Sequence, residues 1–400
     1  MQYHALSLAV NAGDVDLIGL EGAPVQPAVS AESRIRCHRL PDGAFGSRER
    51  HGRRWFVLLS AVRGVRQAAG LLACLLRIPR PDLILVQNPP ASPTLAVAWL
   101  AARLRGARLA IDWHNLSHTV LAVKLGDDHR AVRALARAER RWARRADVHL
   151  AVSEALAAWL GREAGVHATV VRDRPPAFFA KPGLEASAAV WQRVAAELGL
   201  GARRMPVVVC PTSWTPDEDF DLLLESLERA ERRLAALAGA GEAAAPRLVV
   251  LMTGRGTMRA AFEARVARRT FRQLAVRTAW LEPGDYPVLA GSADLGLCLH
   301  RSSSGLDLPM KLADFRGAGV PVAAFDYAPV LAEALRPGHE GVAFRDPDGL
   351  AAILVALATG APDQVPSLGE ARRWLLVNPP RRWDEAWRES AEPALTGRQA

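Results

Sequence analysis

Short apolar runs alternate with longer amphipathic stretches along the whole chain. The apolar runs predict strands, at residues 15–19, 83–86, 109–111, 148–152, 207–210, 248–252, 295–299 and 320–325. The stretches between them have the apolar spacing of helices, as at residues 2–12, 91–104, 129–146 and 220–238. Alternating strands and helices are typical of parallel sheets that helices cover on both faces. The pattern therefore predicts an α/β fold with doubly wound, Rossmann-like domains.

Prolines among charged residues divide the chain into two halves. Residues 172–176 have the sequence RDRPP and residues 181–183 have the sequence KPG, a composition typical of an interdomain linker. We therefore expect an N-terminal Rossmann-like domain at residues 1–178, a C-terminal one at residues 179–365, and a tryptophan-rich helical segment at residues 366–400. Because the chain opens on a predicted helix, the first domain is expected to begin one element later than a doubly wound domain that starts with a strand.

Composition and charge narrow the class of protein. The chain has 400 residues, of which 50% are apolar and 23% charged, the balance of a folded chain with two or three domains. The net charge is +9, but all except three of the 51 basic residues are arginines, which indicates a compositional bias rather than a nucleic-acid interface. The longest charge-free stretch, residues 83–102, contains three prolines, so no membrane-spanning helix is predicted. The 4 cysteines form no metal-ligand motif and are expected to be reduced thiols of a cytoplasmic protein.

Polar residues follow two consecutive predicted strands in the N-terminal half. Gln87 and Asn88 come after one strand, and Asp112, His114 and Asn115 come at the end of the next. Ligands of open α/β sheets bind beyond the carboxyl ends of the strands, so these side chains are expected to line one cleft. A histidine beside an aspartate can act as a general base, which makes His114 the first catalytic candidate and Asp112 the second. A hydrogen-bonded turn with a structural histidine is the alternative.

A polar turn follows the first predicted strand of the C-terminal half. It contains Ser213, Asp217, Glu218 and Asp219 and leads into a predicted helix. Such a helix start can bind an anion, but three acidic residues favour the hydroxyl groups of a sugar or a ribose instead. Capping of the helix explains some of these residues equally well. A metal site formed by the three acids is a further, weaker interpretation.

A glycine-containing turn follows the next predicted strand. Gly254, Arg255 and Gly256 lie between this strand and a helix. Glycines at such a place let backbone N–H groups approach a diphosphate, although an ordinary strand–helix turn has the same pattern.

The segment from residue 300 to residue 314 has the densest set of polar residues. A hydroxyl-rich loop leads into a helix that is predicted to start near Leu308 or Pro309. Lys311 would lie in the first helical turn, where a cation is unfavourable unless an anion binds there. The residues of this segment that we expect to bind a ligand are Ser302, Ser303, Ser304, Gly305, Asp307, Lys311 and Asp314.

One stretch has the pattern of a membrane-surface element. Residues 55–78 are apolar but interrupted by Arg63 and Arg66, and arginines also flank the stretch, at positions 53, 54, 77 and 80. This pattern predicts a pair of amphipathic helices on a membrane surface, with the arginines at phospholipid head groups. A buried core helix is the alternative. The arginine stripe at residues 130–144 is interpreted as a solvated helix face.

Several motifs, taken in order along the chain, resemble the chitobiosyl-diphosphodolichol β-mannosyltransferase family of GT-B glycosyltransferases. They are MQYHALSLA, LVQNPP, IDWHN, TSWTPDEDFDLLLESL, DYPVLAGSADLGLCLHRSSSGLDLPMK and RRWDEAW. The resemblance implies a GT-B fold, with two Rossmann-like domains that face a central cleft. In the family a membrane anchor and a first strand with a glycine-rich turn precede the first of these motifs, and this chain is expected to lack them.

The family adds the first mannose to the lipid-linked GlcNAc₂ core in N-glycan assembly. The resemblance therefore implies GDP-mannose as donor, a polyprenyl-diphosphate chitobiose as acceptor, inversion at the anomeric carbon, and no metal or other cofactor. It assigns the polar residues after 212, 253 and 299 to the donor, and Gln87, Asn88 and Asn115 to the acceptor side. The wider GT-B pattern often has Arg and Lys where this chain has Ser213 and Glu218, so Arg255 and Lys311 are expected to hold the diphosphate.

Two alternatives of other classes remain at this point. One is another GT-B nucleotide-sugar enzyme with a different donor or acceptor, such as a retaining transferase or an epimerase. The other is an inactive, donor-binding scaffold subunit. In the favoured interpretation the protein is peripheral to the cytoplasmic face of a membrane and binds no nucleic acid.

Overall fold

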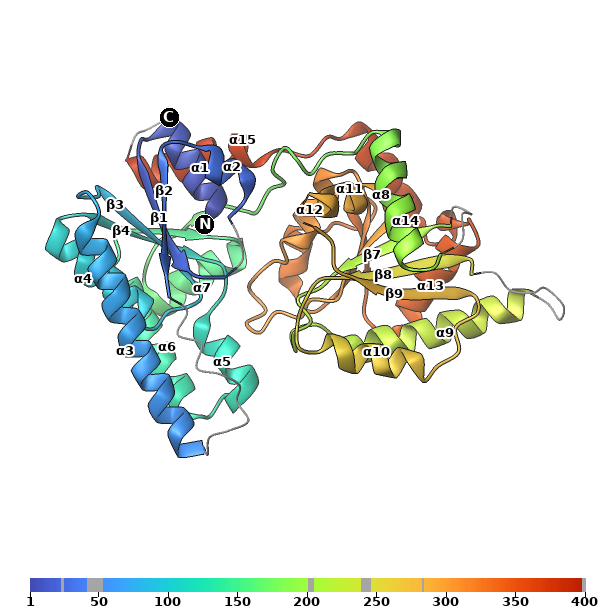
Figure 1. The fold of residues 1–400 in the computed structure, drawn as a ribbon, viewed down its shortest axis with the longest axis horizontal. Helices are drawn as coiled ribbons and strands as arrows, with labels where there is room; N and C mark the ends of the chain where they lie inside the picture. Colours follow the sequence, from blue (N-terminus) through green and yellow to red (C-terminus); the bar gives the residue numbers. More distant parts are fainter. Residues whose placement is uncertain (23–24, 42–52, 201–204, 239–245, 283, 398–400) are drawn as a thin grey trace. The chain divides into compact units, whose positions relative to one another are not determined.

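The fold is built on parallel β-sheets. The computed structural model describes residues 1–22, 25–41, 53–200, 205–238, 246–282 and 284–397. For residues 53–62 and 362 it describes the backbone alone. The chain forms two units, which are unit 1, Met1–Arg172 with Asp384–Ala400, and unit 2, Asp173–Trp383. The chain thus leaves unit 1 inside the predicted linker. Figure 1 shows that it returns to this unit through its last helix, so the predicted segment 366–400 is shared between the units.

Unit 2 is built on a six-stranded parallel sheet in the order β12-β11-β10-β7-β8-β9. Its strands are β7 (Val207–Pro211), β8 (Leu248–Thr253), β9 (Leu274–Ala279), β10 (Leu295–Cys298), β11 (Val322–Phe325) and β12 (Gly341–Phe344). From β7 the chain adds strands first in one direction and then, from β10 on, in the other. The topological switch point, where doubly wound folds bind ligands, therefore lies between β7 and β10.

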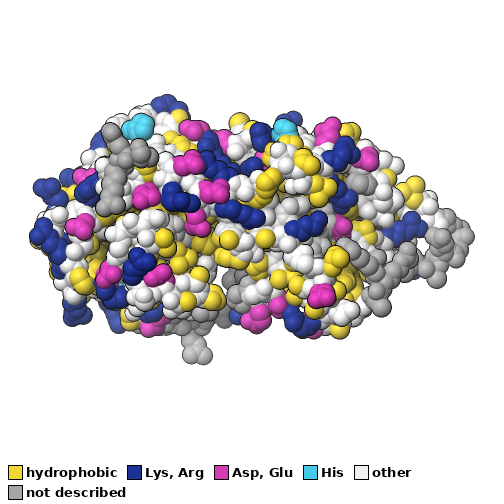
Figure 2. Space-filling view, turned by 90° about the horizontal axis from the view of Figure 1, so that it is seen from above, with side chains coloured by type: hydrophobic (Ala, Val, Ile, Leu, Met, Phe, Trp, Pro, Cys, Tyr) yellow, Lys and Arg dark blue, Asp and Glu magenta, His cyan; other side chains and the backbone are white. Residues whose placement is uncertain are grey.

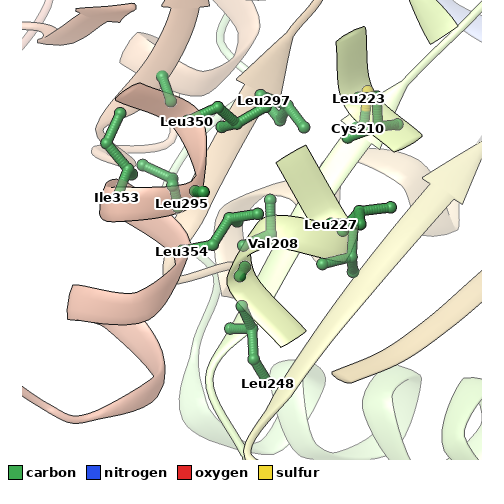
Figure 3. Close-up of a cluster of buried hydrophobic side chains, with 14 of the residues drawn as sticks. Val208, Cys210, Leu223, Leu227, Leu248, Leu295, Leu297, Leu350, Ile353 and Leu354 are labelled. Atoms are coloured by element: carbon green, nitrogen blue, oxygen red, sulfur yellow. The ribbon is translucent and has the colours of Figure 1, made fainter. Parts of the chain in front are cut away.

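Helices cover both faces of this sheet. They are α8 (Leu184–Glu197), α9 (Phe220–Ala238), α10 (Arg259–Ala267), α11 (Asp285–Ser292), α12 (Lys311–Gly317), α13 (Pro347–Ala358) and α14 (Pro366–Val377), with 3-10 turns η1 (Pro329–Glu333) and η2 (Pro362–Gln364). Figure 3 shows one face, where Val208 and other strand side chains pack against Leu227 of α9 and Leu354 of α13. A second cluster of buried side chains fills the space under α8, α11 and α12. Burial on both faces explains why these strands are continuous apolar runs.

The described part of unit 1 holds two parallel sheets. One pairs β1 (Val15–Leu20) with β2 (Ile35–Leu40), and the other contains β3 (Leu83–Asn88), β4 (Arg108–Trp113), β5 (Val148–Ala151) and β6 (Thr169–Val170). The helices are α1 (Gln2–Asn11), α2 (Pro27–Ala31), α3 (Arg53–Arg77), α4 (Thr94–Arg105), α5 (Ser117–Leu125), α6 (Arg130–Ala143), α7 (Glu154–Ala164) and α15 (Trp383–Thr396). The carboxyl ends of β3 and β4 lie side by side, because these strands pair in register up to Asn88 and Trp113.

Every predicted strand is present, but some element ends differ from the prediction. β3 and β4 continue two residues further than predicted, so Gln87, Asn88 and Asp112 lie inside strands rather than after them. The predicted helix pair at residues 55–78 is one helix, α3, and α12 begins at Lys311 rather than at Leu308 or Pro309. The strands β2, β6, β9 and β12 were not predicted. β2 contains two exposed arginines and a half-buried histidine, and β6 has only two residues, so neither gives a clear apolar signal.

The surface is mixed in charge. On the face shown in Figure 2, Lys and Arg side chains are scattered among acidic and apolar ones. Among the described helices, none combines the length and the apolar character that crossing a membrane requires.

Candidate functional site

At the switch point of unit 2, a buried carboxylate holds a lysine. Glu218 follows β7, is 4% exposed, and accepts a hydrogen bond from the Ser213 amide at 3.1 Å and another from the Thr212 hydroxyl. Its other oxygen forms an ion pair with the ammonium group of Lys311, the first residue of α12. Burial is the largest single influence on the pKa of Lys311 and lowers it, but the charge and hydrogen bond of Glu218, together with the nearby thiols of Cys298 and Cys210, raise the pKa overall. Lys311 is therefore a fixed cation, and Glu218 is its internal partner.

A second cation lies at the carboxyl end of β10. The ring of His300 lies between two carboxylates, with Nε2 3.0 Å from Asp307 Oδ2 and Nδ1 3.4 Å from Asp217 Oδ2. Burial lowers the pKa of His300, but hydrogen bonds to Asp217 and Asp307 outweigh burial and raise it to about 9. The hydrogen bond from His300 likewise lowers the pKa of Asp217. His300 is therefore protonated at neutral pH. The sequence analysis missed its role, because nothing in a polar loop shows which carboxylates will flank a lone histidine.

The serine-rich loop folds around Asp307. The Ser302 hydroxyl donates to the Asp307 carboxylate and accepts from the Gly305 amide at 2.8 Å, and the Ser304 hydroxyl lies 3.4 Å from the same carboxylate. Gly305 has φ +69°, which favours glycine. The predicted residues Ser302, Ser304, Gly305 and Asp307 are thus brought together beside His300, and Ser303 lies half-buried in the same turn.

The backbone of the turn after β7 leaves no room for side chains at the two glycines of the turn after β8. A Cβ atom on Gly254 would lie 1.9 Å from the Thr212 carbonyl oxygen, and one on Gly256 would lie 2.0 Å from the Ser213 carbonyl oxygen. Close packing of the two turns is therefore a sufficient reason for both glycines. Arg255 is exposed, and its Cζ lies 3.8 Å from the centroid of the Trp280 ring. This stacking gives the guanidinium group a cation–π partner, and contact of Arg255 with a diphosphate stays a prediction.

The remaining acidic candidates of unit 2 have different partners. Asp219 caps α9 by accepting from the Leu222 amide at 2.9 Å, and it pairs with Arg301 at 3.0 Å. Asp314 accepts a hydrogen bond from the Tyr286 hydroxyl at 3.2 Å, and burial raises the pKa of Asp314 to about 7. Asp217, Glu218 and Asp219 thus turn toward three different cations. In the described part of the chain, no three His, Cys, Asp or Glu side chains are grouped as metal ligands.

In unit 1, one buried carboxylate serves two histidines. Asp112 of β4 is 2% exposed, and its Oδ2 lies 2.8 Å from His114 Nε2 and 3.3 Å from Nε2 of His4 in α1. Burial raises the pKa of Asp112, but the charges of His114 and His4 outweigh burial and the pKa is lowered. The ring of His114 is 20% exposed, whereas Asp112 and His4 are buried. The structure thus brings the two catalytic candidates together and adds His4, which the sequence analysis did not single out.

The acceptor-side candidates are mostly engaged within unit 1. Asn88 is fully buried, and its amide donates to the Asn115 carbonyl at 3.0 Å and to Glu139 at 2.9 Å. Glu139, from the arginine-rich helix α6, also accepts from the Ser117 amide at 2.7 Å. Asn88 therefore holds the loop that follows His114, and direct contact with an acceptor remains a prediction for the half-buried Gln87 and Asn115.

Comparisons with known proteins agree with this architecture. Residues 4–177 match the model of the glycosyl transferase 4-like domain. Chitobiosyldiphosphodolichol beta-mannosyltransferase from Mus musculus is 33% identical over 100% of this chain and 86% of its own length, and its counterpart from Homo sapiens is 33% identical over 99% and 89%. UDP-glycosyltransferase TURAN from Arabidopsis thaliana is 34% identical over 99% of this chain and 94% of its own length.

Solved structures show the same fold. Sucrose-phosphate synthase from Thermosynechococcus elongatus has a TM-score of 0.65 and 16% identity and covers 96% of this chain and 89% of its own. HepE from Anabaena, solved with UDP and glucose, has a TM-score of 0.65 and 13% identity over 96% of this chain and 100% of its own. Identities this low show the fold alone, and the fold is the predicted GT-B class with two Rossmann-like domains.

Proposed function

The chain belongs to the chitobiosyldiphosphodolichol beta-mannosyltransferase family, and from this we propose that it transfers mannose from GDP-mannose to a lipid-diphosphate-linked, GlcNAc-containing acceptor with inversion. The observation that carries the proposal is the fixed cation Lys311, the first residue of α12, at the switch point of unit 2. A nucleoside diphosphate leaves with added negative charge, and preformed cations stabilise that charge without reorganisation.

The proposed reaction is one displacement at the anomeric carbon. The acceptor hydroxyl oxygen forms a bond to C1 of mannose, the bond from C1 to the β-phosphate oxygen breaks, and its electron pair leaves with GDP. The proton of the attacking hydroxyl goes to His114, which acts as the general base. Asp112 holds the Nε2–H of His114 at 2.8 Å, so Nδ1 is the nitrogen with the lone pair. Asp314 is proposed to hydrogen-bond ribose or sugar hydroxyls from α12.

We propose that the reaction needs no metal ion. The three acidic residues after β7 are the sequence feature that most suggested a metal, and each of them already has a cationic partner. Lys311 is proposed to contact the departing diphosphate and so to take the role that a metal ion has elsewhere. Turnover that persists at full rate in excess EDTA is the expected result, and turnover restored only by Mg²⁺ or Mn²⁺ would contradict it.

One observation favours a second candidate function, which differs in the nucleotide of the sugar donor. The relative from Arabidopsis thaliana is named a UDP-glycosyltransferase, whereas the family name specifies mannose. The test is to incubate the purified chain with polyprenyl-diphosphate chitobiose and, in turn, GDP-mannose, UDP-glucose and UDP-GlcNAc, and to weigh the lipid product. We expect one added hexose with GDP-mannose alone. Product from a UDP-sugar instead would replace the proposed donor, and donor binding without product would identify a scaffold subunit.

We also propose that unit 1 binds the cytoplasmic face of an anionic membrane through α3. Within the described side chains of α3, Val65 is 69% exposed beside the exposed Arg66, while the helix also packs on α4 and β2. The side chains of Arg53 and Arg54, which the sequence analysis included, lie outside the described residues. Each basic residue near the lipid surface contributes about 1 kcal/mol, so salt should weaken binding.

The membrane proposal has a charge-matched control. Sedimentation with vesicles that contain phosphatidylserine is compared for a variant with Arg53, Arg54 and Arg66 changed to Gln and a variant with Arg130, Arg133 and Arg137 of α6 changed to Gln. The α3 variant should stay in the supernatant and the α6 variant should sediment like the parent. Equal sedimentation of both variants with the parent would remove α3 from the membrane surface.

A further inference from the structure

A buried chain of hydrogen bonds connects the last helix of the sequence to the candidate base. The indole N–H of Trp387, in α15, donates to Nδ1 of His4 at 3.0 Å, and His4 Nε2 lies 3.3 Å from Asp112 Oδ2. The same carboxylate oxygen meets His114 Nε2 at 2.8 Å. Trp387 is fully buried and His4 is 3% exposed, so water does not compete for these contacts. Residues near both ends of the chain thus meet at Asp112.

The partners assign the protons of the two rings. An indole N–H is a donor only, so His4 Nδ1 must accept, and the hydrogen of neutral His4 is then on Nε2. That N–H points at Oδ2 of Asp112, which lies 3.3 Å from His4 Nε2. The carboxylate in turn receives the Nε2–H of His114. Trp387 thus donates to His4, His4 donates to Asp112, and His114 donates separately to the same carboxylate.

We propose that His4 and Trp387 are positioning residues for catalysis, which act by fixing Asp112 and, through it, the orientation and tautomer of His114. The proposal rests on the proposed function, in which His114 is the base. A buried carboxylate that accepts two hydrogen bonds on one oxygen cannot rotate without breaking both, and a base must be held in place for proton transfer. The return of α15 to unit 1 is then a part of the catalytic apparatus rather than packing alone.

The test separates the hydrogen bonds from the packing. His4→Leu keeps an apolar side chain of similar size but no hydrogen bond, whereas His4→Gln keeps both a donor and an acceptor. Trp387→Phe removes only the indole N–H and part of the ring. The matched control is His149→Leu, because His149 is buried in the same unit and accepts from the Trp113 indole at 3.2 Å, outside the chain that leads to Asp112.

We expect His4→Leu to lower kcat roughly tenfold with an unchanged KM for GDP-mannose, which is less than the loss on removing the base itself. His4→Gln should restore most of that rate, Trp387→Phe should lower kcat by a smaller factor, and His149→Leu should stay within about twofold of the parent. Equal losses in His4→Leu and His149→Leu, or no rescue by Gln, would overturn the positioning role. An inactive His114→Gln together with fully active His4 and Trp387 variants would overturn it and leave the proposed function intact.

A second measurement reads the protonation of His4 in the parent chain and uses the variants only to assign its resonances. In the intact chain labelled with ¹⁵N-histidine, the His4 resonances, assigned through His4→Gln or Trp387→Phe, should show a proton on Nε2 and a bare Nδ1. A proton on Nδ1 would contradict the hydrogen bond from Trp387 and with it the proposal. Full turnover by His114→Gln would instead remove the proposed base, and the positioning role with it.

Discussion

The two units use the same kinds of side chain in opposite ratios. In unit 2 one imidazole, His300, lies between two carboxylates, and in unit 1 one carboxylate, Asp112, lies between two imidazoles. Two carboxylates raise the pKa of His300 to about 9, so this ring keeps its proton at neutral pH. Two histidines lower the pKa of Asp112, so this group stays a carboxylate that divides one negative charge between two rings.

The comparison shows that the carboxylates around a histidine decide whether its ring keeps a proton or can accept one. A histidine that is held protonated cannot accept a proton, but it can hold two carboxylates, and the loops that carry them, in place, as His300 does with Asp217 and Asp307. A histidine that shares a single carboxylate with another ring is oriented by that carboxylate and can accept a proton. We therefore propose that His114 of unit 1 takes part in proton transfer and that Lys311 of unit 2 stabilises charge.

The largest expected effect tests the unit 1 side of this comparison. His114→Gln removes the basic nitrogen and should lower kcat by about 10²–10⁴, while the affinity for GDP-mannose stays unchanged. Turnover and calorimetry on the same preparation separate the two quantities. His167→Gln, at an exposed position of the same unit, is the control and should behave like the parent. Near-normal turnover of His114→Gln with an inactive Asp112→Asn would move the base to Asp112.

The protonation of His300 gives a pH-dependent prediction. Its folded-state pKa of about 9 is above the ordinary 6.5, so its contribution to stability is complete below about pH 6.5 and is lost as the pH rises through 9. The parent should therefore exceed His300→Gln in free energy of unfolding by up to about 3 kcal/mol at pH 6, and by much less at pH 10. Denaturant unfolding across this range measures the difference. A difference that grows with pH would show that His300 is not a fixed cation.

A variant that lacks the charge of Lys311 needs a second substitution, at Glu218. Lys311→Met alone would leave Glu218 buried without a partner, which costs about 3–5 kcal/mol of stability and obscures any effect on binding. In Lys311→Met/Glu218→Gln both charges are gone, and GDP-mannose should bind roughly ten- to a hundredfold more weakly, because one charge-assisted contact to a diphosphate is lost. Lys124→Met in α5 serves as the control for loss of a lysine. Unchanged affinity of the double variant in calorimetry would make Lys311 a structural partner of Glu218 only.

The smallest expected effect decides between two roles of Asp219. If it only caps α9, Asp219→Ala should cost about 1 kcal/mol of stability, Asp219→Ser should recover most of it, and both should bind GDP-mannose normally. Thermal unfolding measures the stability of each variant, and calorimetry measures its affinity for GDP-mannose. Weaker donor binding by both variants, with Ser as poor as Ala, would return Asp219 to the donor site as the family resemblance implies.

The sequence alone predicted the strands of unit 2 and the polar loops that follow them better than the partners of the side chains in those loops. The strands of unit 2 are buried on both faces, so their apolar runs are unmistakable, and the polar loops after them fall at the switch point by topology. The partners depend on contacts between distant residues. Lys311 and Glu218 are 93 positions apart, and Trp387 and His4 are 383 apart. No local pattern encodes such pairs.

Two single residues show the same limit. Asp219 was predicted both as a ligand and as a cap, and the cap is the role that its hydrogen bond to Leu222 displays. The contact of Arg255 with a diphosphate stays a prediction, whereas its stacking on Trp280 was not predicted, because Trp280 directly follows β9, a strand that the sequence pattern did not reveal. Missing one strand therefore meant missing the side chain that holds the arginine.

The anomeric configuration of the product shows whether the reaction is a single displacement at C1 of mannose. In the proposed reaction His114 accepts the proton and Lys311 stabilises the leaving group in a single displacement, which inverts the α-linked mannose of GDP-mannose. The purified chain, incubated with GDP-mannose and polyprenyl-diphosphate chitobiose, should therefore yield a trisaccharide whose new mannose has the β-configuration by NMR and is released by a β-mannosidase. A mannose with the α-configuration, resistant to that enzyme, would contradict the account.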